Sequence, residues 1–316
     1  MTSVHAARTP RTSSQFDTAR VPRAYGVLLL LLAGVLLLNS ILGPLVLNVV
    51  SYPITDSMEN QLIGLELVTA LLVAPWAALA GLAALRGHPA APILGFAPSA
   101  YAAYMFVQYI LGPEYTRYSI TALAQLAIFV LATALMLASW SLSRQVTLPP
   151  MRAAQATRSG LLLFALAAFV LLRYSGAVVG AFTGAHLEGE FADERTFFWS
   201  IFLLDLGIVV PCTVAAGLAL VRGAAVGQRA LYAVVGWFAL VPPSVAAMAV
   251  VMWARHDPHA SVPTVLMLSV VALAFGTFAW HTVHPLLTGR VGADRPGRRG
   301  PMKALAVYES TFGPRR

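Results

Sequence analysis

Long apolar runs alternate with short polar loops along most of the chain. The runs cover approximately residues 25–50, 61–85, 91–111, 119–141, 159–181, 197–221, 230–252 and 263–285. A helix needs roughly 20 apolar residues to cross the hydrocarbon core of a bilayer. Each run is long enough for one crossing, and no loop is long enough to hold a separate soluble domain. We therefore predict an all-α integral membrane protein of eight transmembrane helices.

The composition supports the same class of protein. Of the 316 residues, 58% are hydrophobic and only 11% are charged, a balance that a water-soluble domain could not hide behind its own surface. The pattern predicts one membrane domain over residues 25–285. Residues 1–24 and 286–316 are rich in Pro, Gly, Ser and Arg, and we expect both to be disordered cytoplasmic tails.

The positions of the basic residues predict the orientation. Seventeen of the 21 Lys and Arg residues lie in the two tails and in every second loop, whereas the opposite loops hold only Arg117, Arg195 and Arg255. Because basic residues resist translocation, both termini should be cytoplasmic. Eight of the 13 acidic residues lie on the opposite, outer side. These features predict a multi-pass protein of the cell (inner or plasma) membrane with membrane lipids as neighbours.

Several classes of function are disfavoured by what the chain contains. The net charge of +8 follows mainly from the basic cytoplasmic side, and no ordered basic module indicates nucleic-acid binding. The single cysteine, Cys212, excludes an intramolecular disulfide, a CxxC centre and a thiolate zinc site. No Walker, HExxH or GxSxG motif occurs. We predict no cofactor, and the oligomeric state is left open.

Two segments of the chain are similar to each other. Residues 73–87 read VAPWAALAGLAALRG and residues 209–223 read VVPCTVAAGLALVRG. A Pro, a Gly and an Arg-Gly pair recur at matching spacing, as Pro75 and Pro211, Gly81 and Gly217, and Arg86-Gly87 and Arg222-Gly223. The segments end the second and sixth spans, which predicts a four-plus-four tandem repeat of halves 25–141 and 159–285, related by a pseudo-twofold axis along the membrane normal. The alternative is coincidence between Ala-rich helices.

Two further segments carry a resemblance to known sequences. YAAYMFVQYILGPEY at 101–115 and FLLDLGIVVP at 202–211 are similar to recurrent segments of a family of uncharacterised multi-spanning membrane proteins of bacteria and archaea. That family has a Tyr-rich third span ending in Gly-Pro, and a Leu-Asp pair upstream of a Pro in a later span. The resemblance implies that Asp205 is a recurrent feature, and it implies no activity.

Three ionisable residues lie inside predicted spans, namely Glu66, Arg173 and Asp205. Such residues cost roughly 2.5 to 3.5 kcal/mol or more at mid-membrane and tend to face a bundle interior or a water-filled cavity. All three fall in the outer half of the bilayer, so we predict one cluster. Gly176, Gly180 and Gly184 form a small-residue stripe on the face of Arg173, which predicts that Arg173 points inward toward Asp205.

Neutral polar residues fall at the same predicted depth. Tyr104, Gln108 and Gln125 could line an outward-opening substrate-binding site together with Glu66, Arg173 and Asp205. The alternatives are a purely structural ion pair and ordinary interhelical hydrogen bonds. Tyr109, Tyr115 and Tyr118 are equally typical of an interfacial aromatic belt.

Histidine positions do not predict a metal centre. His281 and His284 lie one helical turn apart with no Cys or carboxylate nearby in sequence, and a metal site needs three or four ligands. The outer loops hold a mixture of His and carboxylate residues whose spacing matches no known motif: His186, Glu188, Glu190, His256, Asp257 and His259. We predict no metal site.

The leading functional interpretation is a small transporter or binding protein for a small molecule or lipid, with its site in the outer half of the bundle. Arg173 would hold an anionic group, and the surplus carboxylate would carry a proton. One alternative is an intramembrane enzyme that acts on a lipid or isoprenoid with Glu66 or Asp205 as general acid or base. The other is a noncatalytic sensor or assembly subunit. The enzyme class is therefore left uncertain, with a non-enzyme favoured.

Overall fold

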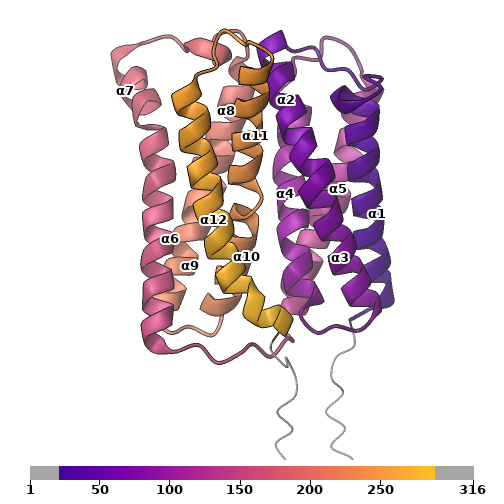
Figure 1. Cartoon of the computed structure of the whole chain (residues 1–316), viewed down its shortest axis with the longest axis vertical. Coiled ribbons are helices and arrows are strands. Elements are labelled where there is room, and N and C mark those ends of the chain that lie inside the picture. Colours follow the sequence, from indigo (N-terminus) through magenta and orange to yellow (C-terminus); the bar gives the residue numbers. More distant parts are fainter. Residues whose placement is uncertain (1–20, 289–316) are drawn as a thin grey trace, which may run out of the picture.

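The computed structural model describes residues 21–288. This part of the chain is helical and contains no strand, as the apolar pattern predicts. The helices stand side by side in an elongated bundle, with the first half of the chain beside the second (Figure 1). The described chain begins and ends at the same end of the bundle (Figure 1). The predicted tails lie almost entirely outside the described residues.

The first half contains α1 (Arg23–Ser40), the π-helical turn η1 (Ile41–Leu45), α2 (Asp56–Val68), η2 (Thr69–Val73), α3 (Ala74–Leu85), α4 (Ala91–Leu111) and α5 (Ile120–Ser143). The second half contains α6 (Ala153–Arg173), α7 (Ser175–Thr183), the 3₁₀ turn η3 (Gly189–Phe191), α8 (Arg195–Leu204), the π-helical turn η4 (Asp205–Val209), α9 (Val210–Val221), α10 (Gly227–Phe238), α11 (Val241–Ala254) and α12 (Val262–Thr288).

Seven helical segments are long and apolar enough to cross a membrane: Arg23–Leu45, Asp56–Leu85, Ile120–Ser143, Ala153–Thr183, Arg195–Val221, Gly227–Ala254 and Val262–Leu287. The chain is therefore a multi-pass membrane protein by length and composition. The predicted span that is not among the seven is the third, residues 91–111, which forms α4. It carries Tyr101, Tyr104 and Gln108 and packs against α3, α5, α8 and α10. A helix covered by protein on several sides needs less apolar surface than one that faces lipid.

The second and sixth predicted spans are interrupted at matching places. Residue Pro75 follows η2 and Pro211 follows η4, each at the second residue of the next α-helix. A proline cannot donate the helical hydrogen bond and clashes with the carbonyl four residues earlier, and the π-helical turn relieves both conflicts locally. The helices α3 and α9 each have 12 residues and end before a glycine with positive φ, 72° at Gly87 and 66° at Gly223.

The buried positions of these two helices also correspond. In and just before α3 they are Val73, Ala74, Ala77, Ala80, Gly81 and Ala84, and around α9 they are Val209, Val210, Thr213, Ala216, Gly217 and Leu220. Glycines sit at the crossing with the preceding helix in both halves. A Cβ atom on Gly81 would lie 2.9 Å from the carbonyl oxygen of Gly26, and one on Gly217 would lie 3.1 Å from that of Gly160. Close helix approach at small residues is common in membrane bundles.

The two halves meet through helices from the middle of each. A Cβ atom on Gly64 of α2 would lie 2.5 Å from the Cα of Met248 in α11, and one on Gly236 of α10 would lie 2.9 Å from the Cβ of Ala97 in α4. The hydroxyls of Tyr101 and Ser244 share a hydrogen bond of 2.8 Å across the same boundary. These contacts hold α2 and α4 against α10 and α11, and they frame the cavity described next.

Candidate functional site: a cavity between the halves and a separate buried carboxyl group

A cavity of about 360 Å³ lies where the two halves meet. Its apolar wall comes largely from α6, α10, α11 and α12, and it extends to the loop between α11 and α12 at His259–Ser261. Five polar side chains lie together at its surface: Gln61, Tyr104, Gln108, Arg173 and Asp205. Four of these five belong to the predicted site, and Gln61 does not.

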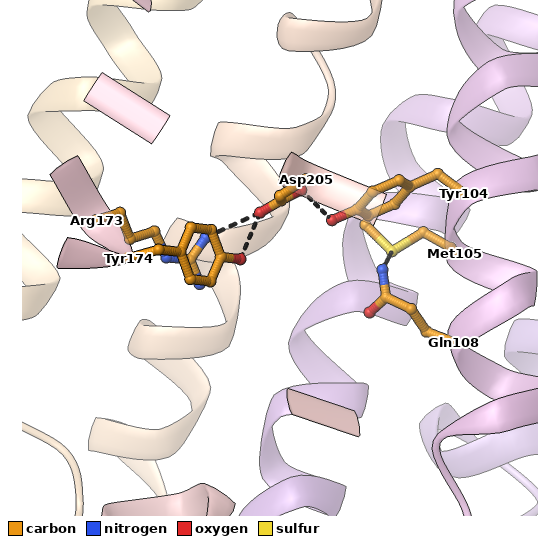
Figure 2. Close-up of polar contacts among 6 residues, drawn as sticks. All are labelled: Tyr104, Met105, Gln108, Arg173, Tyr174 and Asp205. Atoms are coloured by element: carbon orange, nitrogen blue, oxygen red, sulfur yellow. Dashed lines mark hydrogen bonds and ion pairs between the residues drawn. The ribbon is translucent and has the colours of Figure 1, made fainter. Parts of the chain in front are cut away.

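Asp205 is the centre of the polar surface. It begins the π-helical turn η4 and is only 6% exposed. Its Oδ1 accepts a hydrogen bond of 2.6 Å from the Tyr104 hydroxyl of α4, and its Oδ2 accepts one of 2.6 Å from the Tyr174 hydroxyl. Arg173 Nη1 lies 3.9 Å from Oδ2. The donors approach the carboxylate from two sides (Figure 2). Three donors, one of them cationic, satisfy an ionised carboxylate well.

The predicted pairing of Arg173 with Asp205 is present, but the predicted inward direction of Arg173 is wrong. The Arg173 side chain is 50% exposed and lies over the ring of Tyr174, with 5.4 Å between its Cζ and the ring centroid. Regular helix ends at Arg173, and Tyr174 at the break is the residue buried behind it. Arg173 therefore lies at the rim of the cavity.

The glycine stripe on which that direction rested does not pack against another helix. A Cβ atom on Gly176 would meet nothing within 4 Å, and one on Gly180 would meet only Ala185, at 3.6 Å. Gly184 has φ of 70° and ends α7. The end of α7 accounts for Gly184 alone, and α7 has no buried residue.

Two glutamine amides add hydrogen-bonding capacity to the cavity. Gln108 is 6% exposed, and its Nε2 lies 4.0 Å from the sulfur of Met105 (Figure 2). Gln61 is 4% exposed, and its Nε2 has no hydrogen-bond partner. A buried amide donor without a partner costs about 1–3 kcal/mol. The sequence pattern did not single out Gln61, because it is the first residue of the predicted span 61–85. Polar residues at the boundary of a span ordinarily face the loop.

Glu66 and Gln125 are not part of this cavity, contrary to the prediction of one cluster. Glu66 Oε1 accepts a hydrogen bond of 3.0 Å from Asn39 Nδ2, and its Oε2 lies 2.5 Å from Ser40 Oγ. Gln125 Nε2 donates to Asn39 Oδ1 at 3.0 Å and to the Tyr52 hydroxyl at 2.8 Å. This second polar group, which we call the Glu66 network, comprises Asn39, Ser40, Tyr52, Glu66 and Gln125 and lies inside the first half.

The separation of the two groups follows from helix geometry. Gln61 and Leu65 of α2 both line the cavity, as expected for residues four apart on one helical face. Glu66 is one residue further and is therefore rotated by about 100°, toward α1. Equal depth in the membrane places side chains at one level without placing them on one side of a helix.

Tyr109 also departs from its expected place. It is only 2% exposed, and its ring packs against those of Phe106 and Tyr52, with centroids 5.2 Å and 5.7 Å away. Its side chain interacts with Glu66. The interpretation as an interfacial belt residue is therefore wrong for Tyr109, whereas Tyr118 is fully exposed.

The loop after α11 is bonded to the first turns of α2 and so joins the two halves. Asp257 accepts hydrogen bonds from Asn60 Nδ2 at 2.8 Å, from the backbone N–H of His259 at 2.9 Å and from Ser57 Oγ at 3.2 Å. Desolvation opposes ionisation of Asp257, but these hydrogen bonds outweigh it and lower the pKa of the carboxyl group. Within residues 21–288 no group of three or more His, Cys, Asp or Glu side chains could hold a metal ion.

Comparison with protein-family models, with curated proteins and with solved structures finds no match to this chain.

Proposed function

We propose that the chain is an eight-pass membrane protein, built as a duplicated four-helix unit with both termini on the cytoplasmic side. It binds a small amphipathic molecule or lipid in the cavity between its halves, either as a binding protein or as a small transporter. The matched π-helical turns, prolines and glycine crossings of α2–α3 and α8–α9 support the duplication. The described chain begins and ends at one end of the bundle, which supports an even number of crossings that includes α4 (Figure 1).

The main observation that supports a binding function is the cavity itself. Its volume of about 360 Å³ falls in the range of small-molecule sites, which are mostly apolar with a few placed polar groups. Here the aromatic and aliphatic wall includes Phe169, Trp237 and Phe275, and the polar groups gather around Asp205. One face is therefore suited to a hydrocarbon portion and another to a polar head group.

The polar face also restricts the chemistry of the head group. Arg173 and Asp205 offset each other's charge, so the cavity does not demand a ligand of large net charge. Gln61 Nε2 is a buried donor without a partner, and a ligand oxygen that accepts its hydrogen bond would remove that cost. An ester carbonyl, hydroxyl or phosphoryl oxygen on an apolar chain meets these requirements.

The enzyme alternative uses Glu66 or Asp205 as general acid or base, and two carboxyl groups at one substrate would favour it. Glu66 does not line the cavity that Asp205 lines, and Asp205 already accepts three contacts. General acid–base work by this pair on one bond therefore has no support in their positions.

Filling the cavity tests the binding proposal. Ala249 lines the cavity and is 8% exposed, so Ala249→Phe should occupy ligand space. Ala124 of α5 is exposed, and Ala124→Phe is the matched control. Native mass spectrometry of protein released from nanodiscs of phosphatidylethanolamine and phosphatidylglycerol should show a retained small molecule or lipid on the wild type and the control, and its loss from Ala249→Phe.

Equal retention by all three proteins would overturn the cavity as the binding site. Absence of any retained molecule from the wild type would favour the third class, a noncatalytic sensor or assembly subunit with a structural ion pair. The unfolding temperature of each variant shows whether the substitution has disturbed the fold.

A further inference from the structure

Among the acidic and basic side chains of the described residues, Glu66 is the most deeply buried, with 1% of its surface exposed. It lies near the end of α2 and is held between α1 and α4 by Asn39, Ser40 and Tyr109. All three of these partners are neutral. The proposed ligand cavity does not include it, so its burial calls for a separate explanation.

No cationic side chain compensates Glu66 within residues 21–288. The only ion pair found there is that of Arg173 with Asp205. The titratable groups that face Glu66 are three tyrosines: Tyr109 and Tyr101 from α4 and Tyr52 from the loop after η1. Burial raises the pKa of Tyr52 above its ordinary value, so this hydroxyl stays neutral at physiological pH. An ionised, unpaired carboxylate in such surroundings is strongly unfavourable, and such groups normally neutralise.

The number of hydrogen atoms available around Glu66 also indicates a protonated carboxyl group. Ser40 Oγ lies 2.5 Å from Glu66 Oε2 and 3.1 Å from the backbone oxygen of Leu36. A serine hydroxyl has one hydrogen and can donate once. The two contacts of Ser40 Oγ can both be hydrogen bonds only if Ser40 donates to the Leu36 oxygen and the Glu66 carboxyl group donates to Ser40 Oγ. That arrangement requires a proton on Glu66.

The orientation of the neighbouring amide does not remove this requirement. With Asn39 Nδ2 facing Glu66 Oε1, the amide donates and Oε2 carries the proton. With the amide reversed, Asn39 Oδ1 would face Oε1, and two acceptors would meet unless Glu66 supplied the hydrogen. In the first orientation Gln125 Oε1 remains a buried acceptor without a partner. The Tyr109 side chain also bonds to Glu66, but its hydrogen does not change the count at Ser40, which has one hydrogen for two acceptors.

We propose that Glu66 is a proton-binding site, occupied in this conformation and distinct from the ligand cavity. The protein thus uses its two buried acids differently: Asp205 accepts from two tyrosine hydroxyls and Arg173, and Glu66 is a neutral acid that donates to Ser40. Ser40 is the last residue of α1 before η1, and Glu66 lies three residues before η2. The proton therefore joins two helices just where each leaves regular α geometry.

Release of the proton has a structural consequence. It would leave an unpaired negative charge against Ser40 and Asn39, and the site would then have to admit water or separate α1 from α2. The network reaches the loop after η1 through Gln125 and Tyr52, which gives it a connection to the predicted outer side. The site can in this way make the packing of the first half depend on proton concentration.

Infrared difference spectroscopy of the full-length protein in nanodiscs tests the proposal. A protonated carboxyl group has a C=O stretching band that a carboxylate lacks. The wild type should show a band that survives at neutral pH and shifts in Ser40→Ala, because the hydrogen bond from Glu66 is lost. Glu66→Gln should remove it, whereas Glu188→Gln, at an exposed loop position, should leave it unchanged.

A band that persists in Glu66→Gln, or the absence of any protonated-carboxyl band at neutral pH, would overturn the proposal. Sodium is the competing occupant of a buried carboxylate with amide oxygens nearby. A rise in unfolding temperature with added NaCl but not with choline chloride, lost in Glu66→Gln, would also overturn it. None of these readouts depends on ligand binding, so the proposed function and this site can fail independently.

Discussion

The hydroxyl of Tyr104 donates a hydrogen bond of 2.6 Å to Oδ1 of Asp205, and this bond joins the first half of the bundle to the second. Tyr104 comes from α4, and Asp205 comes from the start of η4. The two residues are 101 positions apart in the chain. A charge-assisted bond in a buried place is among the stronger polar contacts of a protein, so this pair holds the polar face of the cavity together.

Replacing Tyr104 with Phe should weaken the contact between the halves. The substitution keeps the ring and its edge-on packing against Trp237, with centroids 5.2 Å apart, and removes the donor to Asp205. We expect a loss of about 1.5–3 kcal/mol of stability, typical of a hydrogen bond to a charged group. Denaturant unfolding in detergent measures it. Tyr118→Phe, at a fully exposed position, should be neutral, and equal effects would contradict the role of the bond.

The two members of the ion pair should respond differently to substitution. Arg173→Met should cost no more than about 1 kcal/mol, because a pair with one half-exposed partner is screened by its surroundings. Asp205→Asn should cost more, because the charge that both tyrosine hydroxyls and Arg173 approach is removed while the donors stay buried. Unfolding of the single and double variants compares the two costs. A larger loss for Arg173→Met than for Asp205→Asn would contradict the rim position of Arg173.

Close approach of α2 to α11 predicts an intolerant glycine. In Gly64→Ala the new Cβ would lie 2.5 Å from backbone atoms of Met248, so the helices must move apart, with a cost of about 1–3 kcal/mol typical of overpacking. Gly34 of α1 has nothing within 4 Å of the same position, and Gly34→Ala should be neutral or stabilising because alanine favours helix. Similar unfolding temperatures for the two variants would show that the halves do not meet as described.

Asp257 should make stability depend on acid pH. Its folded-state pKa is lowered by hydrogen bonds from Asn60, His259 and Ser57, so it stabilises the fold at pH values above the ordinary Asp pKa of about 3.9. That contribution is lost as the pH falls through the folded pKa. Asp257→Asn should therefore lower stability at neutral pH and flatten its acid dependence. Unfolding midpoints measured from neutral to acid pH check this, and parallel curves for both proteins would contradict it.

Glu66 should give the opposite dependence. A site that holds a proton in the folded protein loses stability as rising pH removes that proton. The unfolded chain loses this proton near the ordinary Glu pKa of about 4.3, so the wild type should become easier to unfold as the pH rises above that value, until the folded protein also releases the proton. Glu66→Gln should lose this component because the amide keeps the shape without a titrating proton. Unfolding temperature measured from about pH 4 upward tests the difference. Glu188→Gln should follow the wild type, and a Glu66→Gln curve parallel to that of the wild type would contradict the prediction.

The sequence predicts much of this architecture because bilayer thickness imposes length and hydropathy on each helix. It also predicts the contact of Arg173 with Asp205, since charges at equal depth on neighbouring helices tend to pair. It does not predict that Glu66 turns away from them. Depth follows from counting residues, whereas direction depends on the rotation of α2 about its axis, which is set by its packing against α1 and α11.

Interrupted helices explain other misses. A π-helical turn inserts an extra residue into a helix. The helical face that a periodic pattern predicts before η2 or η4 is therefore rotated after the turn. Tyr174 lies at the break between α6 and α7, and no periodic pattern marks it as the residue that turns inward. α4 falls outside the seven candidate spans because Pro, Tyr and Gln residues lower its mean hydropathy.

A molecule bound in the cavity between the halves should accept a hydrogen bond from Gln61. The fraction of protein that retains a small molecule or lipid in native mass spectrometry tests this, compared between Gln61→Leu and Gln155→Leu, the latter at an exposed position of α6. We expect retention on Gln155→Leu equal to the wild type and weakened about tenfold or more on Gln61→Leu, the effect of losing a buried hydrogen bond of about 1–3 kcal/mol. Equal retention by both variants would contradict it.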